Sequence, residues 1–154
     1  MLSGGSMQQT KKNQGFTLIE LMVTVAIMAI IAIMAAPSFN SLIMNQNLKK
    51  STDSLIQEIR VARSKAILDK REITLNLASL SSNTNSVMNW SPEGKVKLKT
   101  ASNNQLKFNG SGVLTTFGTF SVVELCKTSG TTNSKKITLT ALGQIEKIEE
   151  GSCP

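Results

Sequence analysis

The chain has 154 residues, a formal net charge of +7 and no histidine. This length suits one modest domain with an attached segment, and the lack of histidine removes the commonest general base and the commonest metal ligand. The basic balance is compatible with nucleic acid, acidic lipid or an acidic protein partner, and it selects none of them.

The first predicted element is a long apolar helix over residues 16–36. This run, FTLIELMVTVAIMAIIAIMAA, is 21 residues long (36 − 15) and contains a single charge, that of Glu20. At about 1.5 Å per residue, such a helix reaches roughly 31 Å, the thickness of a bilayer core. The remaining residues, 37–154, are enough for one small domain.

Three kinds of targeting segment compete for residues 1–36. A secretory signal peptide begins with basic residues, and Lys11 and Lys12 provide such a start. However, a signal-peptidase site requires two small residues two positions apart, and no two alanines of the run have this spacing. The run is also long for a signal peptide. A plain membrane anchor fits the length but leaves Glu20 unexplained. A carboxylate costs about 2.5–3.5 kcal/mol at the centre of a bilayer, and less near the edge where Glu20 lies.

The third kind of segment accounts for Glu20. The stretch GFTLIEL, which begins at Gly15, resembles the class III signal of type IV prepilins and pseudopilins, and the resemblance extends to Pro37. It implies that a prepilin peptidase cuts between Gly15 and Phe16 and methylates the new amino terminus on Phe16. Glycine has no side chain and therefore suits a peptidase site at the membrane face.

The same resemblance implies an assembly role for Glu20. In a filament its carboxylate would pair with the Phe16 amine of a neighbouring subunit, which offsets the cost of burying either charge alone. Residues 1–15 would then be a cleaved leader, with its start at Met1 or at Met7. The lysines of the leader favour a cytoplasmic amino terminus. Lys49 and Lys50 lie beyond the other end of the apolar run and weaken this charge difference. The family resemblance also implies a cytoplasmic amino terminus.

The helical pattern continues beyond Pro37. A proline inside a helix removes one hydrogen bond, so we expect a kink there. From residue 38 to residue 71 the sequence predicts an amphipathic helix whose apolar positions recur at spacings of seven, four, three and four. These positions are Leu48, Leu55, Ile59, Ala62 and Ala66. The stripe predicts a helix half that packs on a globular head.

After residue 71 the apolar period changes to two, which predicts short strands over residues 73–154. Alternation occurs at 73–77, 95–99, 106–108, 120–125 and 137–139, and Gly143 marks a bend before Ile145. Polar stretches at 79–89 and 129–134 predict loops, and Gly110 and Gly112 mark a turn. The predicted fold class is α+β, with a long N-terminal helix packed on a small, mostly antiparallel β-sheet head.

This order of elements resembles the GspH/FimT family of minor pilins and pseudopilins. The matching pieces of the head are 106–112 (LKFNGSG), 119–122 (TFSV) and 136–143 (KITLTALG), in that order behind the prepilin signal. The resemblance covers nearly the whole chain. It implies a type IV pilin-like fold and a structural role in a filament.

Two cysteines, Cys126 and Cys153, lie 27 residues apart (153 − 126) and lack the CxxC spacing of a metal site. In an exported domain we expect one disulfide between them, worth roughly 3.5 kcal/mol by chain entropy. The alternative is two free thiols. Similar disulfides occur in the minor pilins that the chain resembles.

No motif favours an enzyme, a cofactor or a metal site. Gly110 and Gly112 begin like a dinucleotide loop, but Thr115 occupies the third glycine position, so a turn between strands is favoured. Lys95, Lys97 and Lys99, considered together with Lys107, form either a phosphate patch or a solvated face that discourages edge pairing. We favour the solvated face, since no aromatic residue alternates with these lysines.

Three functions follow from the resemblance. The first is a minor pilin that primes type IV pilus assembly, and the basic charge and tail disulfide favour it. The second is a minor pseudopilin of type II secretion, and the third is a DNA-binding minor pilin. DNA receptors of the family carry Gly-Arg-x-Arg where this chain has Gly143-Gln144-Ile145-Glu146, so DNA binding is expected to be weak. The expected partners are other minor and major pilins, the prepilin peptidase and the bacterial inner membrane, with the head in the periplasm.

Overall fold

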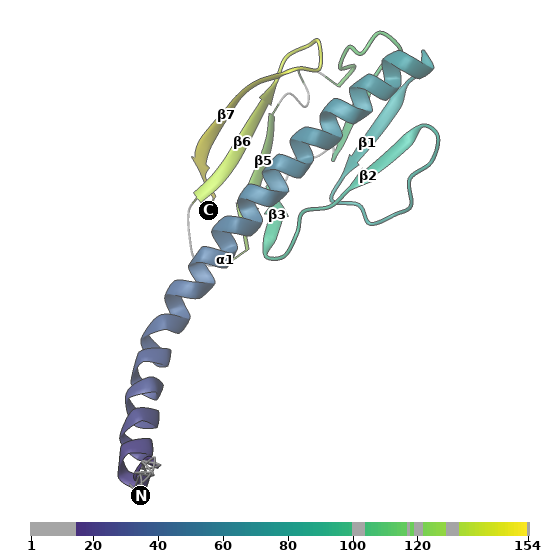
Figure 1. Ribbon diagram of the computed structural model, residues 1–154. Coiled ribbons are helices and arrows are strands. Elements are labelled where there is room, and N and C mark those ends of the chain that lie inside the picture. Colours follow the sequence, from purple (N-terminus) through teal and green to yellow (C-terminus); the bar gives the residue numbers. More distant parts are fainter. Residues whose placement is uncertain (1–14, 100–103, 117, 119–121, 129–132, 154) are drawn as a thin grey trace, which may run out of the picture. The chain divides into compact units, whose positions relative to one another are not determined.

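The computed structural model describes residues 15–99, 104–116, 118, 122–128 and 133–153, with the backbone alone at 36–38. Residues 1–14 of the predicted leader, Phe120 and most of the polar stretch at 129–134 lie outside these residues. The chain divides into two compact units, with the boundary between Phe39 and Asn40, and each is described by itself. Figure 1 shows the elements in chain order.

The helix α1 runs from Leu18 to Asp69 and contributes to both units (Figure 1). The backbone at Pro37 is helical, so the two predicted helical stretches belong to one element. In the first unit the apolar side chains of α1 are exposed, and none of the stretch Leu18–Ala35 is buried. The kink expected at Pro37 stays a prediction.

In the second unit, α1 buries the stripe that the spacing predicted. Leu55, Ile59, Ala62 and Ala66 are fully buried, and Leu48 is nearly so. The two alanines have small side chains and therefore allow the strands to approach the helix closely. Two polar residues of the same face are also buried, and the Ser51 hydroxyl accepts a hydrogen bond from the Glu93 amide at 2.9 Å.

Seven strands are described in the head, and they form two sheets. The first sheet has the order β2-β1-β4, with β1 at Ile73–Leu77, β2 at Val87–Trp90 and β4 at Gln105–Phe108. Alternate side chains of β1 and β4 enter the core, as period two requires. The predicted strands at 73–77 and 106–108 are therefore confirmed.

The pairing of β1 with β2 differs from the antiparallel arrangement that we expected. These strands are parallel, with Thr74 opposite Val87 and Leu77 opposite Trp90. Parallel neighbours need a connection that brings the chain back to the end at which the first strand begins. The predicted loop at 79–89 supplies it up to residue 86, but the prediction is wrong at residues 87–89, which belong to β2. Asn89 holds this loop along the strand, since its side-chain amide nitrogen, Nδ2, donates a hydrogen bond to the Ser82 carbonyl oxygen at 3.0 Å.

The second sheet is antiparallel throughout and has the order β3-β5-β6-β7. Its strands are β3 at Val96–Leu98, β5 at Val122–Lys127, β6 at Asn133–Leu139 and β7 at Ile145–Ser152. Gly143 lies in the turn between β6 and β7 with a φ of +68°. This value favours glycine and confirms the predicted bend.

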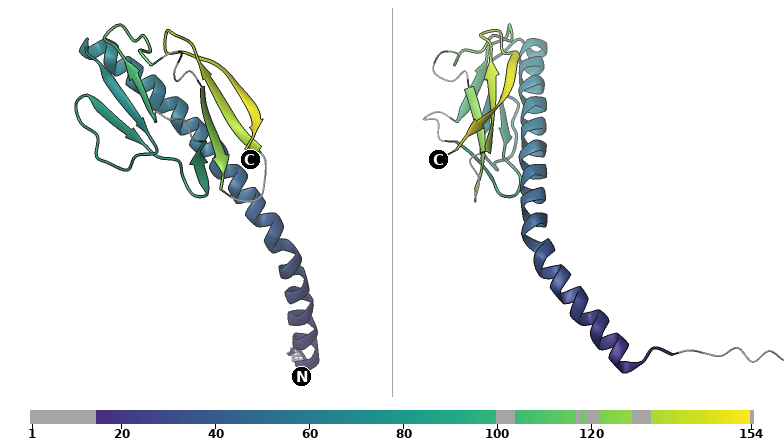
Figure 2. Two further views of the ribbon diagram at one scale, coloured as in Figure 1. Left: turned by 180° about the vertical axis from the view of Figure 1, so that it is seen from behind. Right: turned by 90° about the vertical axis from the view of Figure 1, so that its left-hand side faces the viewer.

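One hydrophobic core joins both sheets to α1. Seen edge-on, the part of α1 that lies in the head forms one layer and the strands form the other (Figure 2). The largest buried side chains include Phe108, Leu125 and Ile137 from the strands and Leu55 and Ile59 from the helix. All described core residues lie between Leu48 and Cys153, so the head has a core of its own.

The helix ends two residues before the predicted boundary at residue 71. The Arg71 amide donates to Ala66 O at 3.3 Å, and Lys70 has a φ of +50°. A bond that spans five residues around a left-handed residue is the Schellman ending of a helix, which usually places glycine at the left-handed position. The helix therefore stops because the backbone reverses at Lys70.

This ending yields a stability prediction. Replacing Lys70 with glycine removes the steric cost of a left-handed side chain, and we expect the free energy of unfolding to rise by about 0.5–1 kcal/mol. The matched control is Leu68→Gly, an exposed position in regular helix, which should lose about 1 kcal/mol. Chemical denaturation of the head measures both, and a loss of stability in Lys70→Gly would contradict the assigned ending.

Candidate processing and assembly segment

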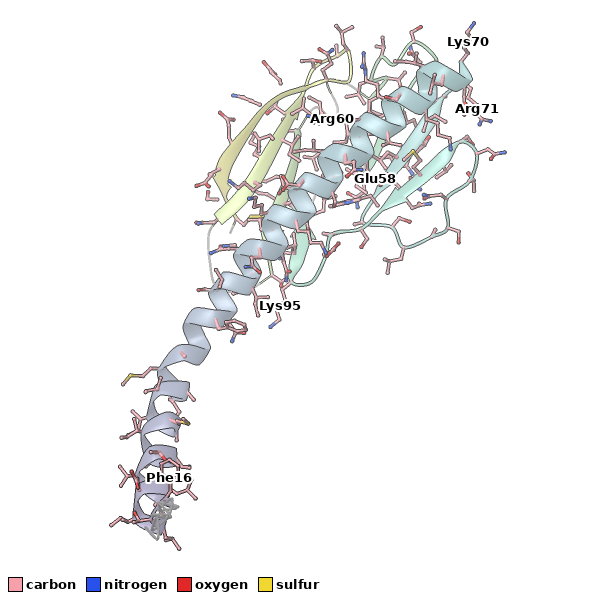
Figure 3. All side chains as sticks on the ribbon, in the orientation of Figure 1. Phe16, Glu58, Arg60, Lys70, Arg71 and Lys95 are labelled. Carbon is pink, nitrogen blue, oxygen red and sulfur yellow. A yellow bond between two sulfur atoms is a disulfide. The ribbon has the colours of Figure 1, made fainter. Side chains whose placement is uncertain are left out.

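The segment before α1 is open to solvent and to an enzyme. Gly15, Phe16 and Thr17 precede the helix without regular structure, and a Cβ added to Gly15 would meet no atom within 4 Å. The Phe16 side chain is 86% exposed and lies at the start of the helix (Figure 3). The predicted cleavage bond thus lies in accessible, non-helical chain, as a peptidase requires.

Thr17 caps the helix. Its hydroxyl accepts a hydrogen bond from the Glu20 amide at 3.3 Å, and its carbonyl accepts one from Leu21 at 3.2 Å. Threonine followed three residues later by glutamate is the pattern of a capping box. This capping box is visible in the sequence but was not among our predictions.

Glu20 consequently has a local role as well as the predicted assembly role. It lies in the first turn of α1, where a carboxylate interacts favourably with the positive end of the helix dipole. A capping role needs a side chain that accepts hydrogen bonds, which glutamine also has. A role in pairing with an amine needs the negative charge. These two requirements can be separated by substitution.

The first unit presents an apolar surface on every side of its helix. The stretch Leu18–Ala35 has a mean hydropathy of 2.6, and by length and composition it could cross a membrane. Large apolar side chains such as Leu18, Ile33 and Met34 are more than two-thirds exposed. A surface of this kind must be covered by lipid or by other apolar helices.

The cysteines are joined in a disulfide, and no free cysteine remains in the chain. Cys126 lies on β5, Cys153 follows β7, and their Cα atoms are 6.0 Å apart. Both residues are buried. Because β6 lies between β5 and β7, the bond ties the end of the chain to a strand that is not its neighbour.

A charged cluster lies beside the disulfide. The Glu124 carboxylate accepts a hydrogen bond from Ser134 and pairs with Lys99 at 2.9 Å. Partial burial raises the pKa of Glu124, but the Ser134 hydroxyl and the Lys99 ammonium lower it by more, so this pKa lies below its usual value. A depressed pKa gives stability that is present at neutral pH and lost as the pH falls through the folded-state value. A Cβ on Gly151 would lie 2.5 Å from the Ser134 hydroxyl, so a side chain there would displace this hydroxyl from Glu124.

The structure separates the lysines that were considered as a patch. Lys95 and Lys97 are exposed at β3, but Lys99 pairs with Glu124 and also donates to Ser152 O at 3.1 Å. Lys107 lies on β4, in the other sheet. Lys99 is thus engaged within the head, and only Lys95 and Lys97 have the exposure expected of a solvated face.

The glycine pair is a turn, as predicted. The Gly112 amide donates to Asn109 O at 2.8 Å, and Gly112 has a φ of +77°. The Asn109 side chain accepts from Ser111 and Val113, each at 3.0 Å. Trp90, at the end of β2, is buried, and its indole N–H donates to the Ser54 hydroxyl at 2.8 Å.

The motif GFTLIE at the start of an apolar helix, together with a two-layer head, defines a type IV pilin-like protein. Residues 10–36 match the prokaryotic N-terminal methylation motif, and residues 51–143 match the family described as type II transport protein GspH. The second match covers more than half of the chain. The chain therefore belongs to the GspH family of minor pilins and pseudopilins.

The head resembles a solved structure, the type IV minor pilin FimU of Pseudomonas aeruginosa strain PAO1. The two are 15% identical, and the similarity covers 71% of this chain and 97% of FimU with a TM-score of 0.51. At this level of identity the likeness concerns the fold. No curated protein sequence matches this chain.

The disulfide gives a direct prediction. The folded head should show no reactive thiol before reduction, because both cysteines are bonded. Reduction should lower the free energy of unfolding by roughly 3.5 kcal/mol, the chain-entropy value for a loop of this size. Thiol titration and thermal melting measure these effects, with Cys126→Ser/Cys153→Ser as the control that reduction leaves unchanged. Two reactive thiols in the unreduced head would contradict the bond.

Proposed function

We propose that this chain is a minor pilin of a type IV pilus, a structural subunit that helps to prime filament assembly. The observation that carries the proposal is the apolar surface of Leu18–Ala35, which none of the residues that the structure describes covers. Lipid covers it before assembly, and the helices of other pilins cover it in a filament. The net charge of +7 and the disulfide between Cys126 and Cys153 are our grounds for placing it in a pilus.

Processing follows from the start of the same helix. A prepilin peptidase removes residues 1–15 by cutting the bond between Gly15 and Phe16, and it methylates the Phe16 amine. Residues 16–36 then anchor the subunit in the inner membrane, with the amino terminus on the cytoplasmic side. Residues 37–154 form the periplasmic head. The accessible, non-helical chain around Gly15 supports this order of events.

Glu20 acts in assembly by pairing with the Phe16 amine of the next subunit. Inside a bundle of apolar helices, an unpaired carboxylate and an unpaired amine are each costly. Placing one against the other removes both costs and fixes the axial register of the two helices. The other partners of this segment are therefore major and minor pilins with apolar helices of the same kind.

A minor pseudopilin of a type II secretion system is the second candidate. The description of the matched family, type II transport protein GspH, favours it. Both machines use the same anchor and the same processing, so the segment at residues 15–36 does not separate them. Identifying the filament that contains the chain would separate them, since each machine has its own major subunit.

Intact-mass analysis of protein taken from membranes tests the processing. We expect a chain that starts at N-methylated Phe16 and carries the disulfide. The control is a Gly15→Ala variant, which should accumulate with its leader because a side chain at the cleavage site obstructs the peptidase. A mature chain that starts near Ala36, as ordinary signal peptidase would leave, contradicts the proposal.

Substitutions at Glu20 distinguish the assembly role from the capping role. Glu20→Ala and Glu20→Gln should both insert into the membrane and both enter filaments at least about tenfold less than the native chain, because each leaves an amine unpaired. Comparing the amounts in membranes and in sheared filaments gives this ratio.

Thr17→Ala is the matched control for capping. It removes the hydroxyl that caps α1, at a cost of about 1 kcal/mol, but keeps the charge of Glu20. We expect it to enter filaments nearly as well as the native chain. If Glu20→Gln assembled normally while Thr17→Ala did not, helix capping and not charge pairing would explain the glutamate.

A further inference from the structure

A pocket of about 440 Å³ lies between α1 and the turn that joins β6 to β7. Arg60, Arg63 and Ser64 line it from the helix, and Gly143, Gln144 and Ile145 line it from the turn and the start of β7. Arg60 projects from the side of α1 that borders β6 and β7 (Figure 3). The lining thus contains two guanidinium groups and no carboxylate.

Arg63 is held in place by the turns around it. Its Nε–H donates to Leu142 O at 2.8 Å and to Gly112 O at 3.2 Å. These bonds orient the planar guanidinium and use only the Nε donor, so the Nη donors keep their hydrogens for another acceptor. A group oriented in advance loses less entropy when it binds a ligand.

Arg60 has no counter-charge within the part of the chain that the structure describes. It is exposed, and the five ion pairs found among those residues involve neither Arg60 nor Arg63. The two arginines are three residues apart and therefore lie on the same face of α1. Two neighbouring cations without a carboxylate favour an anionic ligand.

The wall opposite the arginines is rigid. The Gly143 amide donates to Thr140 O at 2.9 Å, and the Gln144 amide donates to the Thr140 hydroxyl at 3.2 Å. A Cβ at Gly143 would lie 2.7 Å from the Phe108 ring, so the turn packs directly on the core. The pocket is therefore a built feature of the head.

The chemistry around the pocket selects a single carboxylate over a polyanion. β7 begins at the pocket wall and carries Glu146, which has no ion pair among the described residues and would repel a nucleic-acid backbone that extends beyond the pocket, whereas Glu149 and Glu150 are paired with Lys147 and Lys135. One carboxylate side chain meets only the arginines. A guanidinium presents parallel N–H donors that match the two oxygens of a carboxylate.

An adjacent apolar groove indicates that the carboxylate belongs to a protein. This shallow groove, of about 380 Å³, lies on α1 alone and shares Arg60 and Ser64 with the pocket. Val61 and Leu68 supply its apolar surface, and Gln57, Lys65 and Asp69 also line it. Leu68 is 80% exposed and Val61 is 45% exposed. A free anion would leave this groove empty, whereas an acidic side chain with apolar neighbours fills both.

We propose that the Arg60–Arg63 pocket receives an aspartate or glutamate side chain from the head of a neighbouring pilin subunit, whose flanking apolar residues cover Val61 and Leu68. The inference rests on the proposed function, since it takes the partner to be another pilin. It adds a contact between heads to the pairing of the anchors at Glu20.

Binding to the isolated head, residues 40–154, tests the pocket chemistry, because all described core residues lie within this part. The probe is N-acetyl-glutamate N-methylamide, followed by NMR at constant ionic strength. We expect saturable shifts at the Gly143 and Gln144 amides with a Kd of about 1–10 mM, weakened about tenfold in Arg60→Ala. Absent shifts, or shifts that persist unchanged in Arg60→Ala, overturn the proposal.

Inorganic phosphate and a short DNA duplex are the comparison ligands in the same titration. We expect phosphate to bind no tighter than the carboxylate probe, and duplex DNA to show only non-specific affinity of roughly 10⁻⁴–10⁻⁶ M, independent of Arg60. Tighter DNA binding that Arg60→Ala abolishes would make this pocket a nucleic-acid site and overturn the carboxylate assignment.

Assembly of the full chain tests the partner. Arg60→Glu should lower the amount in filaments about tenfold, whereas Arg60→Lys should lower it less because it keeps the charge. Lys49→Glu is the matched control, since it makes the same charge change on an exposed part of α1 outside the pocket. Normal assembly of Arg60→Glu, or an equal loss in Lys49→Glu, overturns the inference. Absence of the native chain from pili would instead overturn the proposed function.

Discussion

One helix with two hydrophobic patterns is the constraint on which the rest of the molecule depends. From Leu18 to Ala35 the apolar side chains surround α1, whereas from Leu48 to Ala66 they occupy a single stripe. The first pattern demands a surrounding apolar medium, and the second demands a partner on one side only. The division into two units follows, because the strands cover the stripe and leave the rest uncovered.

The features that follow from simple periodicity could be predicted from the sequence. The stripe from Leu48 to Ala66 is buried as its spacing indicates, and the period-two segments at 73–77 and 137–139 are strands. Periodicity reports which face of an element is apolar, and burial of that face is nearly obligatory in a small domain. It reports nothing about which strands become neighbours.

That limit explains what the sequence did not reveal. The parallel pairing of β1 and β2 depends on a loop held by Asn89, whose side chain looks like any other polar residue of a loop. Trp90 can be buried because its indole N–H donates a hydrogen bond to the hydroxyl of Ser54, which lies on α1. The Arg60–Arg63 pocket arises where a helix meets a turn some eighty residues further along the chain. Each feature needs a long-range contact that local patterns do not encode.

The disulfide also determines how the head would carry a mechanical load in the proposed filament. A force applied between α1 and the end of the chain must pass along the backbone. At Cys126 the bond to Cys153 offers a shorter path than the hairpin of β6 and β7. The load therefore crosses from β5 directly to the tail. Both strands of the hairpin, and the Gly143 turn that forms one wall of the pocket, remain outside the stretched path while the bond is intact.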